Sequence, residues 1–310
     1  MLSRTLVIAM NTYREAVRAR ILHGLFGLGI ATSGYALVVG AYSLRNTNRV
    51  VADLGAASIS AYAIIVAIML GATSLYRELE LKTIFPILAR PIERWEYLLG
   101  KFLGTVLTLV AFIAANSGLL LFSLGALTTR SLQSSLLAPC AVVVVAGLLG
   151  WGLPRLRSWL PIPVGFVLLA LGAWFARDAV SDRNVILGQG LLSLLEVCIV
   201  TALTLLFAAF SSPFLTAVFT LAVFLVGRSA DTLAQLPERV FGPVLKQVGV
   251  VLSRVFPNLM VYVPSRTLLT GEAIGVEYWR YTGWAAVQAL GWAVGLLTVS
   301  SWVFKRRDFL

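Results

Sequence analysis

The sequence contains little charge, with only 13% of its 310 residues being Asp, Glu, Lys or Arg and a mean hydropathy of +0.88. A soluble chain of this length would carry a far more charged surface and only short apolar segments. Several apolar runs instead exceed the roughly 20 residues that cross about 30 Å of hydrocarbon. The composition therefore predicts an all-α integral membrane protein, since helices satisfy their own backbone groups in lipid.

Residues that bind metals or perform acid–base and nucleophilic chemistry are also scarce. The two cysteines, Cys140 and Cys198, lie inside apolar runs, so neither a disulfide framework nor a metal site is expected. The single histidine, His23, lies beside the first apolar run without a cluster of carboxylates. No catalytic, cofactor-binding or metal-binding residue is therefore predicted. Residues 1–20 carry four arginines and lack the pattern of a cleavable signal peptide.

Eight apolar segments are long enough, or nearly long enough, to span a membrane. They are Ile21–Leu44, Val51–Tyr76, Leu99–Leu127, Leu136–Leu153, Trp159–Phe175, Val185–Phe210, Phe214–Val226 and Tyr281–Phe304. Six would form a core, and residues 128–183, which contain the fourth and fifth, would add a transmembrane hairpin. The fourth, fifth and seventh are short, so a re-entrant or tilted path is the alternative for them.

The distribution of basic residues predicts that both termini are cytoplasmic. With the N-terminus inside, the inner segments carry 14 Lys and Arg, whereas the short outer loops carry five. Cytoplasmic loops of multi-pass proteins show this enrichment. The same bias explains the net charge of +11, so no nucleic acid is expected as a partner. The expected location is the plasma or inner membrane of the cell, with the lipid bilayer as solvent.

Two amphipathic stretches lie outside the predicted spans. Residues 1–20 are predicted to form a cytoplasmic helix that lies in the membrane interface, followed by a single transmembrane domain over residues 21–310. Residues 228–280 are predicted to be an extracytoplasmic helical segment. Its apolar stripe at Val240–Phe256 predicts a helix that lies on the outer surface or caps the bundle, and Pro257 would end that helix.

Residues 77–101, RELELKTIFPILARPIERWEYLLGK, form a charged island between two apolar runs. Each ion in hydrocarbon costs about 3 kcal/mol, so the island is predicted to fold at one membrane face. A turn is expected at Arg90-Pro91, because a residue before proline avoids the helical region. Pro91 and Glu93 then suit the first turn of a second helix. A soluble partner that pushed on this loop would move the spans on both sides of it.

The island carries a resemblance to the ABC-2 type permeases of ABC transporters. The segment YRELELKTIFPILARPIERWEYLLGKFLG at 76–104 is the most specific part of it. Similar segments are NTYREAVRARIL at 11–22, SSPFLTAVFTLAVFLVGRSADTL at 211–233, PNLMVY at 257–262 and the terminal FKRRDFL. They follow the family's order and cover most of the chain. The extra hairpin at 128–183 departs from the family pattern.

The resemblance implies a six-helix permease core that pairs with a second copy or a homologous permease. It implies two ABC ATPase subunits as partners, which would carry ATP and Mg²⁺. Residues 1–20 would be the elbow helix, and residues 77–101 the coupling-helix loop that docks on the ATPase. By position, the docking candidates are Glu78, Glu80, Thr83, Arg90, Pro91, Arg94 and Glu96.

The sequence lacks a phosphate-binding loop of its own. That loop has the pattern Gly-x-x-x-x-Gly-Lys-Ser/Thr, in which backbone N–H groups hold the phosphates. Here Gly100-Lys101 is followed by Phe102, and Trp95 occupies the position of the earlier glycine. The chain is therefore not expected to be an enzyme, and the ATPase is expected to be a separate polypeptide.

Glu196 is an ionisable residue in the middle of a predicted span. Such residues are rare and often functional, because a carboxylate there must be protonated or paired. Glu196 is therefore either a structural residue, such as one at a helix or dimer interface, or part of a substrate path or of the coupling. Asp53, near the outer end of the second span, is expected to be interfacial and hydrated.

These observations favour the membrane permease of an ATP-driven exporter, which moves a substrate or acts on an extracytoplasmic partner. A stand-alone secondary transporter or channel is the rival, but it would more often show several intramembrane charges and inverted repeats. A membrane-embedded enzyme would need clustered His, Asp or Glu, which the sequence lacks. Lipids, glycoconjugates, peptides and small hydrophobic compounds are all open as substrates.

Overall fold

The computed structural model of the protein describes residues 2–43, 46–80, 93–128, 132–153, 156–272, 275 and 277–306. Over these residues the chain is helical and contains no strand, which confirms the all-α class. Each of the eight predicted apolar segments corresponds to a helix. These helices are α2 (Arg20–Tyr42), α3 (Thr47–Glu80), α5 (Arg94–Thr128), α6 (Leu132–Gly152), α7 (Pro161–Phe175), α8 (Val180–Ala208), α9 (Pro213–Arg228) and α13 (Tyr278–Arg306).

Six of the described helices are long and apolar enough to cross a membrane, namely α2, α3, α5, α6, α8 and α13. They are not the six that the sequence predicts for the core, because α6 is long enough and α9 is not. Helices α7 and α9 have 15 and 16 residues, which corresponds to about 22–24 Å. Both begin at a proline in the first turn, a position that proline favours. Helix α9 therefore stops before it has crossed about 30 Å of hydrocarbon.

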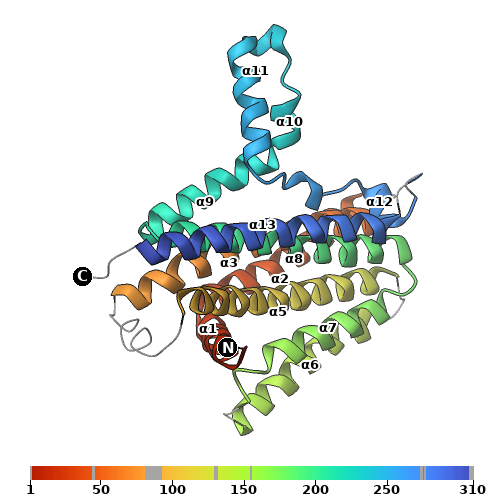
Figure 1. Ribbon diagram of the computed structural model, residues 1–310. Coiled ribbons are helices and arrows are strands. Elements are labelled where there is room, and N and C mark those ends of the chain that lie inside the picture. Colours follow the sequence, from red (N-terminus) through yellow and green to blue (C-terminus); the bar gives the residue numbers. More distant parts are fainter. Residues whose placement is uncertain are drawn as a thin grey trace.

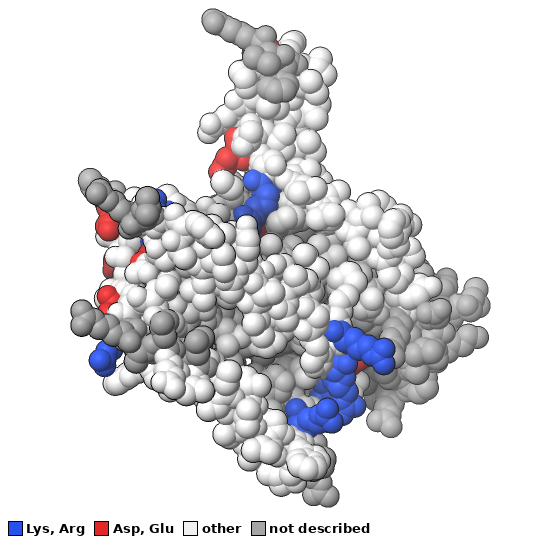
Figure 2. Space-filling view, turned by 180° about the vertical axis from the view of Figure 1, so that it is seen from behind, with Lys and Arg blue, Asp and Glu red and all other residues white. Residues whose placement is uncertain are grey.

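The core of the bundle is built from α3, α5 and α8, which run side by side along its length (Figure 1). Their shared interior contains Ile59, Ala63, Leu109, Phe112, Leu120, Val197 and Val200. Helices α2 and α13 lie on the outside of this core and are largely exposed. Seen from behind, charged side chains gather at the two ends of the bundle and leave a mostly uncharged belt between them (Figure 2). This distribution suits a bundle that spans a bilayer.

The extra hairpin packs against the core through α7. A Cβ atom on Gly118 of α5 would lie 2.5 Å from the backbone carbon of Leu168, and one on Gly172 of α7 would lie 2.5 Å from the Gly118 carbonyl oxygen. The two backbones can approach this closely only because both residues are glycine. Helix α6 lies outside α7. Only 6% of its most apolar stretch is buried, compared with 67% for that of α8.

Helix α1 (Leu2–Arg18) is the amphipathic N-terminal helix that the sequence predicts. It lies on α5, where a Cβ on Gly104 would meet the Ala9 carbonyl oxygen at 2.4 Å. Ala9 and Tyr13 are buried in this contact, whereas Leu6 is 62% exposed. The buried face therefore follows the small residues that allow close packing with α5, and Leu6 is free to face the membrane interface.

The segment between α9 and α13 contains α10 (Ala230–Ala234), α11 (Glu238–Val255), the short 3-10 helix η1 (Met260–Tyr262) and α12 (Arg266–Thr270). The predicted apolar stripe forms α11, which ends just before Pro257. It does not cap the bundle. Helices α10 and α11 instead project away from the bundle (Figure 1). We call residues 230–256 the arm.

The close contact of α5 with α7 gives a testable prediction. Gly118→Ala should lower the apparent Tm of the purified protein by roughly 3–8 °C, because overpacking a tight contact costs about 1–3 kcal/mol. Gly147→Ala on α6 is the matched control, because a Cβ there would meet no atom within 4 Å. Thermal unfolding in the same detergent compares the two variants. Equal Tm values for both would show that α7 is not held against α5 in this way.

Candidate functional site

Glu196 lies in the middle of α8, with its side chain fully buried at 0% exposure. It is paired with Arg228, the last residue of α9, whose Nε donates to Glu196 Oε1 at 2.8 Å and whose Nη2 donates to Oε2 at 2.9 Å. Two parallel bonds of this kind form the strongest common carboxylate–guanidinium geometry. Glu196 is therefore held as one half of a buried ion pair between α8 and α9.

Helix α3 joins this pair through Ser60. The Ser60 hydroxyl donates to Glu196 Oε2 at 3.4 Å and accepts from Arg228 Nη2 at 3.3 Å. Both bonds are long for their type, so they are weaker than the bonds within the ion pair. The polar bonds at this level thus join α8 to α9 strongly, whereas the polar bonds of α3 to this pair are weak.

The position of Arg228 depends on a close backbone approach at the end of α9. The Leu259 N–H donates to the Gly227 carbonyl at 3.0 Å, and a Cβ on Gly227 would lie 2.6 Å from the Pro257 carbonyl oxygen. Because residue 227 is glycine, the chain at Pro257–Leu259 can pass directly beside the end of α9. The guanidinium of Arg228 can then reach α8, and its side chain stays 24% exposed.

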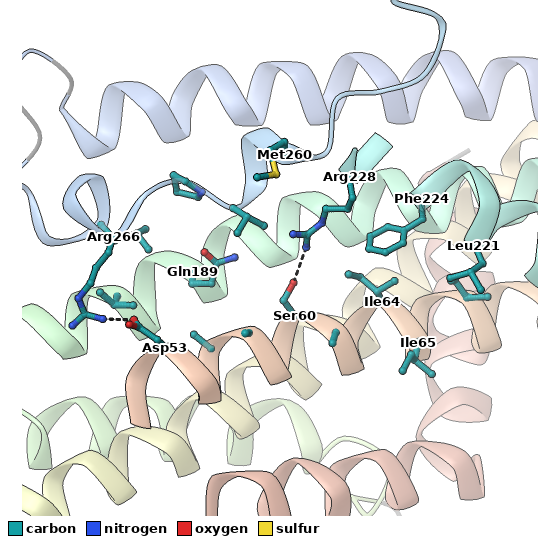
Figure 3. Close-up of a pocket in the computed structure, with 18 residues that line it drawn as sticks. Asp53, Ser60, Ile64, Ile65, Gln189, Leu221, Phe224, Arg228, Met260 and Arg266 are labelled. Carbon is teal, nitrogen blue, oxygen red and sulfur yellow. Dashed lines mark hydrogen bonds and ion pairs between the residues drawn. The ribbon is translucent and has the colours of Figure 1, made fainter. Parts of the chain in front are cut away.

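A cavity of about 750 Å³ opens beside the ion pair, between α3, α9 and the segment that contains η1 and α12 (Figure 3). Its lining includes Ile64, Ile65, Leu221 and Phe224 at one end and Asp53 and Arg266 at the other, with Ser60, Gln189, Arg228 and Met260 between. Most of the wall is apolar, and a few polar groups point into it (Figure 3). A volume of this size and a wall of this kind suit a small or medium-sized apolar or amphipathic ligand.

A second charge cluster lines the end of the cavity next to α12. Arg266 of α12 forms ion pairs with Asp53 of α3 and Asp182 of α8. The Arg266 side chain is 20% exposed and the Asp53 side chain is 46% exposed. The Asp53 side chain is thus half-exposed, and it also holds α12 to α3. Its interfacial hydration stays a prediction.

The irregular chain around η1 is held by side chains of neighbouring helices. Gln189 Nε2 donates to the Tyr262 carbonyl at 2.9 Å. The Tyr262 hydroxyl donates to the Ala285 carbonyl at 3.1 Å, and the Tyr281 hydroxyl donates to the Val261 carbonyl at 2.6 Å. Non-helical backbone at membrane depth is tolerated where the protein satisfies it in this way. These bonds fix the wall of the cavity that faces Ser60.

The acidic side chains around the cavity are occupied by ion pairs. No group of three or more His, Cys, Asp or Glu that could hold a metal occurs among the described residues. The carboxylates that line or adjoin the cavity, Asp53, Asp182 and Glu196, are all engaged with arginines.

Of the predicted ATPase-docking residues, Thr83, Arg90 and Pro91 lie outside the described residues. Glu78 and Glu80 are in the last turns of α3, and nothing is described of their side chains. The prediction for these five positions stays a prediction.

The other two docking candidates, Arg94 and Glu96, lie at the start of α5 and have local partners. Arg94 Nη1 donates to the carbonyls of Phe304 at 2.6 Å and Lys305 at 2.9 Å, so it binds the C-terminal end of α13. Glu96 is 1% exposed and accepts from the Glu93 N–H at 3.3 Å, as a carboxylate in a first helical turn does. Arg94 thus ties the region next to the charged island to α13.

Glu196 stands out from the sequence alone, but its partner does not. Arg228 is predicted to begin the outer segment, whereas the structure places it beside Glu196, within the bundle. One signal could have corrected this: the apolar run that precedes Arg228, Phe214–Val226, is too short to cross a membrane. A helix of this length that begins at the inner membrane face ends within the hydrocarbon, so the residue that follows it lies there as well. The structural reading of Glu196, a paired carboxylate at a helix interface, matches this geometry.

A comparison with protein families finds one match. The model of a family described as ABC-2 family transporter protein matches residues 6–309, nearly the whole chain. No curated protein matches the sequence. The family match confirms the resemblance that the charged island and the other segments indicate.

Removing one partner of the buried ion pair should be strongly destabilising. Arg228→Met should lower stability by about 3–5 kcal/mol, because Glu196 must then stay buried as an ion or take up a proton. The double variant Glu196→Gln/Arg228→Met should recover part of this loss, because no charge is left without a partner. Thermal unfolding of the purified variants measures both effects.

The control for this pair is Arg177→Met. Arg177 pairs with Asp178 at the surface, with side chains 61% and 58% exposed, so its loss should cost less than about 1 kcal/mol. A double variant as unstable as Arg228→Met, or an Arg228→Met variant as stable as the control, would contradict the importance of the pair.

Proposed function

Since this chain belongs to the ABC-2 family of transporter proteins, we propose that it is the permease subunit of an exporter driven by a separate ABC ATPase. In this proposal two ATPase subunits dock on the cytoplasmic side of two permease copies, and ATP and Mg²⁺ are bound by the ATPase alone. The cavity between α3 and α9 receives the substrate. Both chain termini are cytoplasmic, and the protein resides in the cell membrane.

The observation that carries this proposal is the continuity of α3. This helix runs without interruption from Thr47 to Glu80, and it contributes Asp53, Ser60 and Ile64 to the cavity wall. Its last turns begin the charged island at 77–101. An α-helix of 34 residues is about 51 Å long. A displacement of the island by the ATPase therefore moves the cavity wall as part of the same helix.

The polar contacts of the cavity suggest which wall moves. Helices α8 and α9 are joined by the two short bonds of Glu196 with Arg228, at 2.8 and 2.9 Å. Helix α3 packs on α8 through apolar side chains, but its polar bonds to the ion pair, from Ser60, are long, at 3.3 and 3.4 Å. A motion of α3 relative to α9 breaks these long bonds and leaves the ion pair intact. At the other end of the cavity, Asp53 and Arg266 keep α3 joined to α12, so such a motion widens the cavity beside Ser60.

A stand-alone secondary transporter is the second candidate. In such a protein, intramembrane carboxylates commonly exchange protons or ions during transport. Here Glu196 has no exposed surface and is bound by Arg228 at both oxygens. The family match also favours the ATP-driven class. We therefore retain the secondary transporter only as an outcome of the test below.

The proposal predicts that an ABC ATPase binds at the charged island. The variant Glu78→Lys/Glu80→Lys should reduce the amount of copurified ATPase at least tenfold, because reversing two charges at a docking surface replaces attraction by repulsion. Glu272→Lys is the matched control, because Glu272 is exposed on the segment predicted to be outside. The ATPase is identified in the complex by mass spectrometry, and ATP turnover is measured with and without it.

The permease alone should show no turnover above a lipid-only control. Turnover by the complex should disappear when the phosphate-loop lysine of the ATPase is replaced by alanine. Transport driven by an ion gradient with no ATPase bound would instead support the secondary transporter.

The proposed topology predicts labelling from opposite sides of the membrane. Arg157→Cys and Ser265→Cys, each in a chain with Cys140 and Cys198 replaced by serine, should report different compartments. Both positions are exposed, so access is set by the membrane and not by burial. An impermeant maleimide should label Ser265→Cys in intact cells and Arg157→Cys only after lysis. Labelling of both in intact cells would show that the hairpin of α6 and α7 does not return to the cytoplasm.

A further inference from the structure

The arm, residues 230–256, has an apolar surface that no described part of the chain covers. Helices α10 and α11 pack on each other, since a Cβ on Gly249 would meet the Leu233 carbonyl oxygen at 2.5 Å. Beyond that contact α11 touches only the end of α9 appreciably. Its exposed valines are Val244 (71%), Val248 (47%), Val251 (58%) and Val255 (58%). Their spacing of four, three and four residues places them in one stripe, as at the seam of a coiled coil.

Hydrogen bonds at the base of the arm fix its depth. Asn258 Nδ2 donates to Asp231 Oδ1 at 2.7 Å, and Gln288 Nε2 of α13 donates to the Asn258 carbonyl at 3.3 Å. Gln288 lies roughly ten residues, or about 15 Å, from the outer end of α13. Half the thickness of the hydrocarbon is also about 15 Å. The arm therefore leaves the bundle near the middle of the membrane and projects away from the other helices (Figure 1).

Neither lipid nor water suits the whole surface of the arm. The side chains of Glu238 and Lys246, which pair at 3.0 Å, are 55% and 44% exposed, and Arg254 is exposed as well. Figure 2 also shows acidic and basic side chains at the foot of the arm. Lipid disfavours each of these ions strongly. Water disfavours the valine stripe. A protein surface that offers apolar contact beside polar groups is compatible with both.

A second copy of the chain offers such a surface at this depth. Helix α9 stops at Arg228, and the cavity beside it has an exposed apolar rim. The rim of the cavity exposes Ile65 (44%), Leu221 (47%) and Met260 (42%). Arg228 lines the cavity, and the arm starts two residues after it, so cavity and arm lie on the same flank. Two copies related by a two-fold axis along the membrane normal would bring each arm to the other copy's flank.

We propose that the arm is a clasp between two copies of this chain, in which the valine stripe of each α11 seats on the apolar rim of the partner's cavity. This inference rests on the proposed function in one respect, namely that the permease works as a pair. The arm supplies the outer-leaflet contact that the short α9 leaves missing. It also covers the side opening of the partner's cavity, so a substrate that leaves sideways has to displace it.

Cross-linking between two differently tagged copies tests the clasp. Both copies have Cys140 and Cys198 replaced by serine. One copy carries Val248→Cys, and the other carries Ile65→Cys, Leu221→Cys or Met260→Cys. A bis-maleimide that spans about 10 Å tolerates small errors in register, unlike a disulfide, which needs Cα atoms within about 7 Å. At least one rim position should give a strong hetero-tagged dimer band in native membranes.

The matched control pairs Val248→Cys with Leu290→Cys. Leu290 is 65% exposed on α13 but does not line the cavity, so its band should be at least tenfold weaker. Absence of a band at all three rim positions, with the two tags still copurifying, would overturn the clasp and leave the proposed function standing. A strong band in membranes from which no ATPase copurifies would support the clasp and count against the proposed function.

A second set of variants tests whether the valine stripe makes the contact. Val244→Glu/Val251→Glu, placed in the chain with Val248→Cys, should reduce the cross-link at least tenfold, because charge replaces the apolar seam. Gln247→Glu in the same chain should leave the yield within twofold, because Gln247 is polar and exposed beside the stripe. The amount of membrane-inserted chain is matched before comparison. Equal yields in the stripe and control variants would overturn the seating of the valines.

Discussion

Most features of this protein follow from one constraint, which is that hydrocarbon tolerates neither unpaired ions nor unsatisfied backbone groups. The bidentate pair of Glu196 with Arg228 is how the bundle meets this constraint at its centre. Side chains such as Gln189 and Tyr281 meet it for the irregular chain around η1. These bonds fix α9 and the chain around η1 on α8 and α13, and the cavity lies between them and α3.

The constraint also separates parts of the bundle that can move from parts that cannot. Helices α5 and α7 touch backbone to backbone at Gly118 and Gly172, so the extra hairpin follows α5 in any motion. Helices α8 and α9 share an ion pair. Helix α3 packs into the core beside α5 and α8, but its polar bonds to the ion pair, from Ser60, are weak, and it is the helix that continues to the charged island. A cytoplasmic motor that moved the island would therefore act on the cavity through α3.

The sequence predicted the helices well, because apolar run length reports membrane helices directly. It also found Glu196, since a carboxylate within an apolar run is rare. It failed where the outcome depended on depth and direction. Arg228 follows an apolar run and was placed outside, although α9 is too short to bring it there. The stripe of α11 was correctly predicted as helical, but no periodicity tells whether a helix lies on the bundle or stands away from it. Arg94 was predicted at a partner surface because of its motif, and the structure adds its bonds to the end of α13.

The pair of Glu196 with Arg228 has a further consequence for biogenesis. The two residues lie on consecutive helices, so both are synthesised within a short time of each other. Inserted singly, α8 would carry an uncompensated anion into lipid and α9 an uncompensated cation, at about 3 kcal/mol each. Inserted together, they enter as a neutral unit. We therefore expect α8 and α9 to leave the insertion machinery as one hairpin, with the ion pair already formed before the rest of the bundle assembles around it.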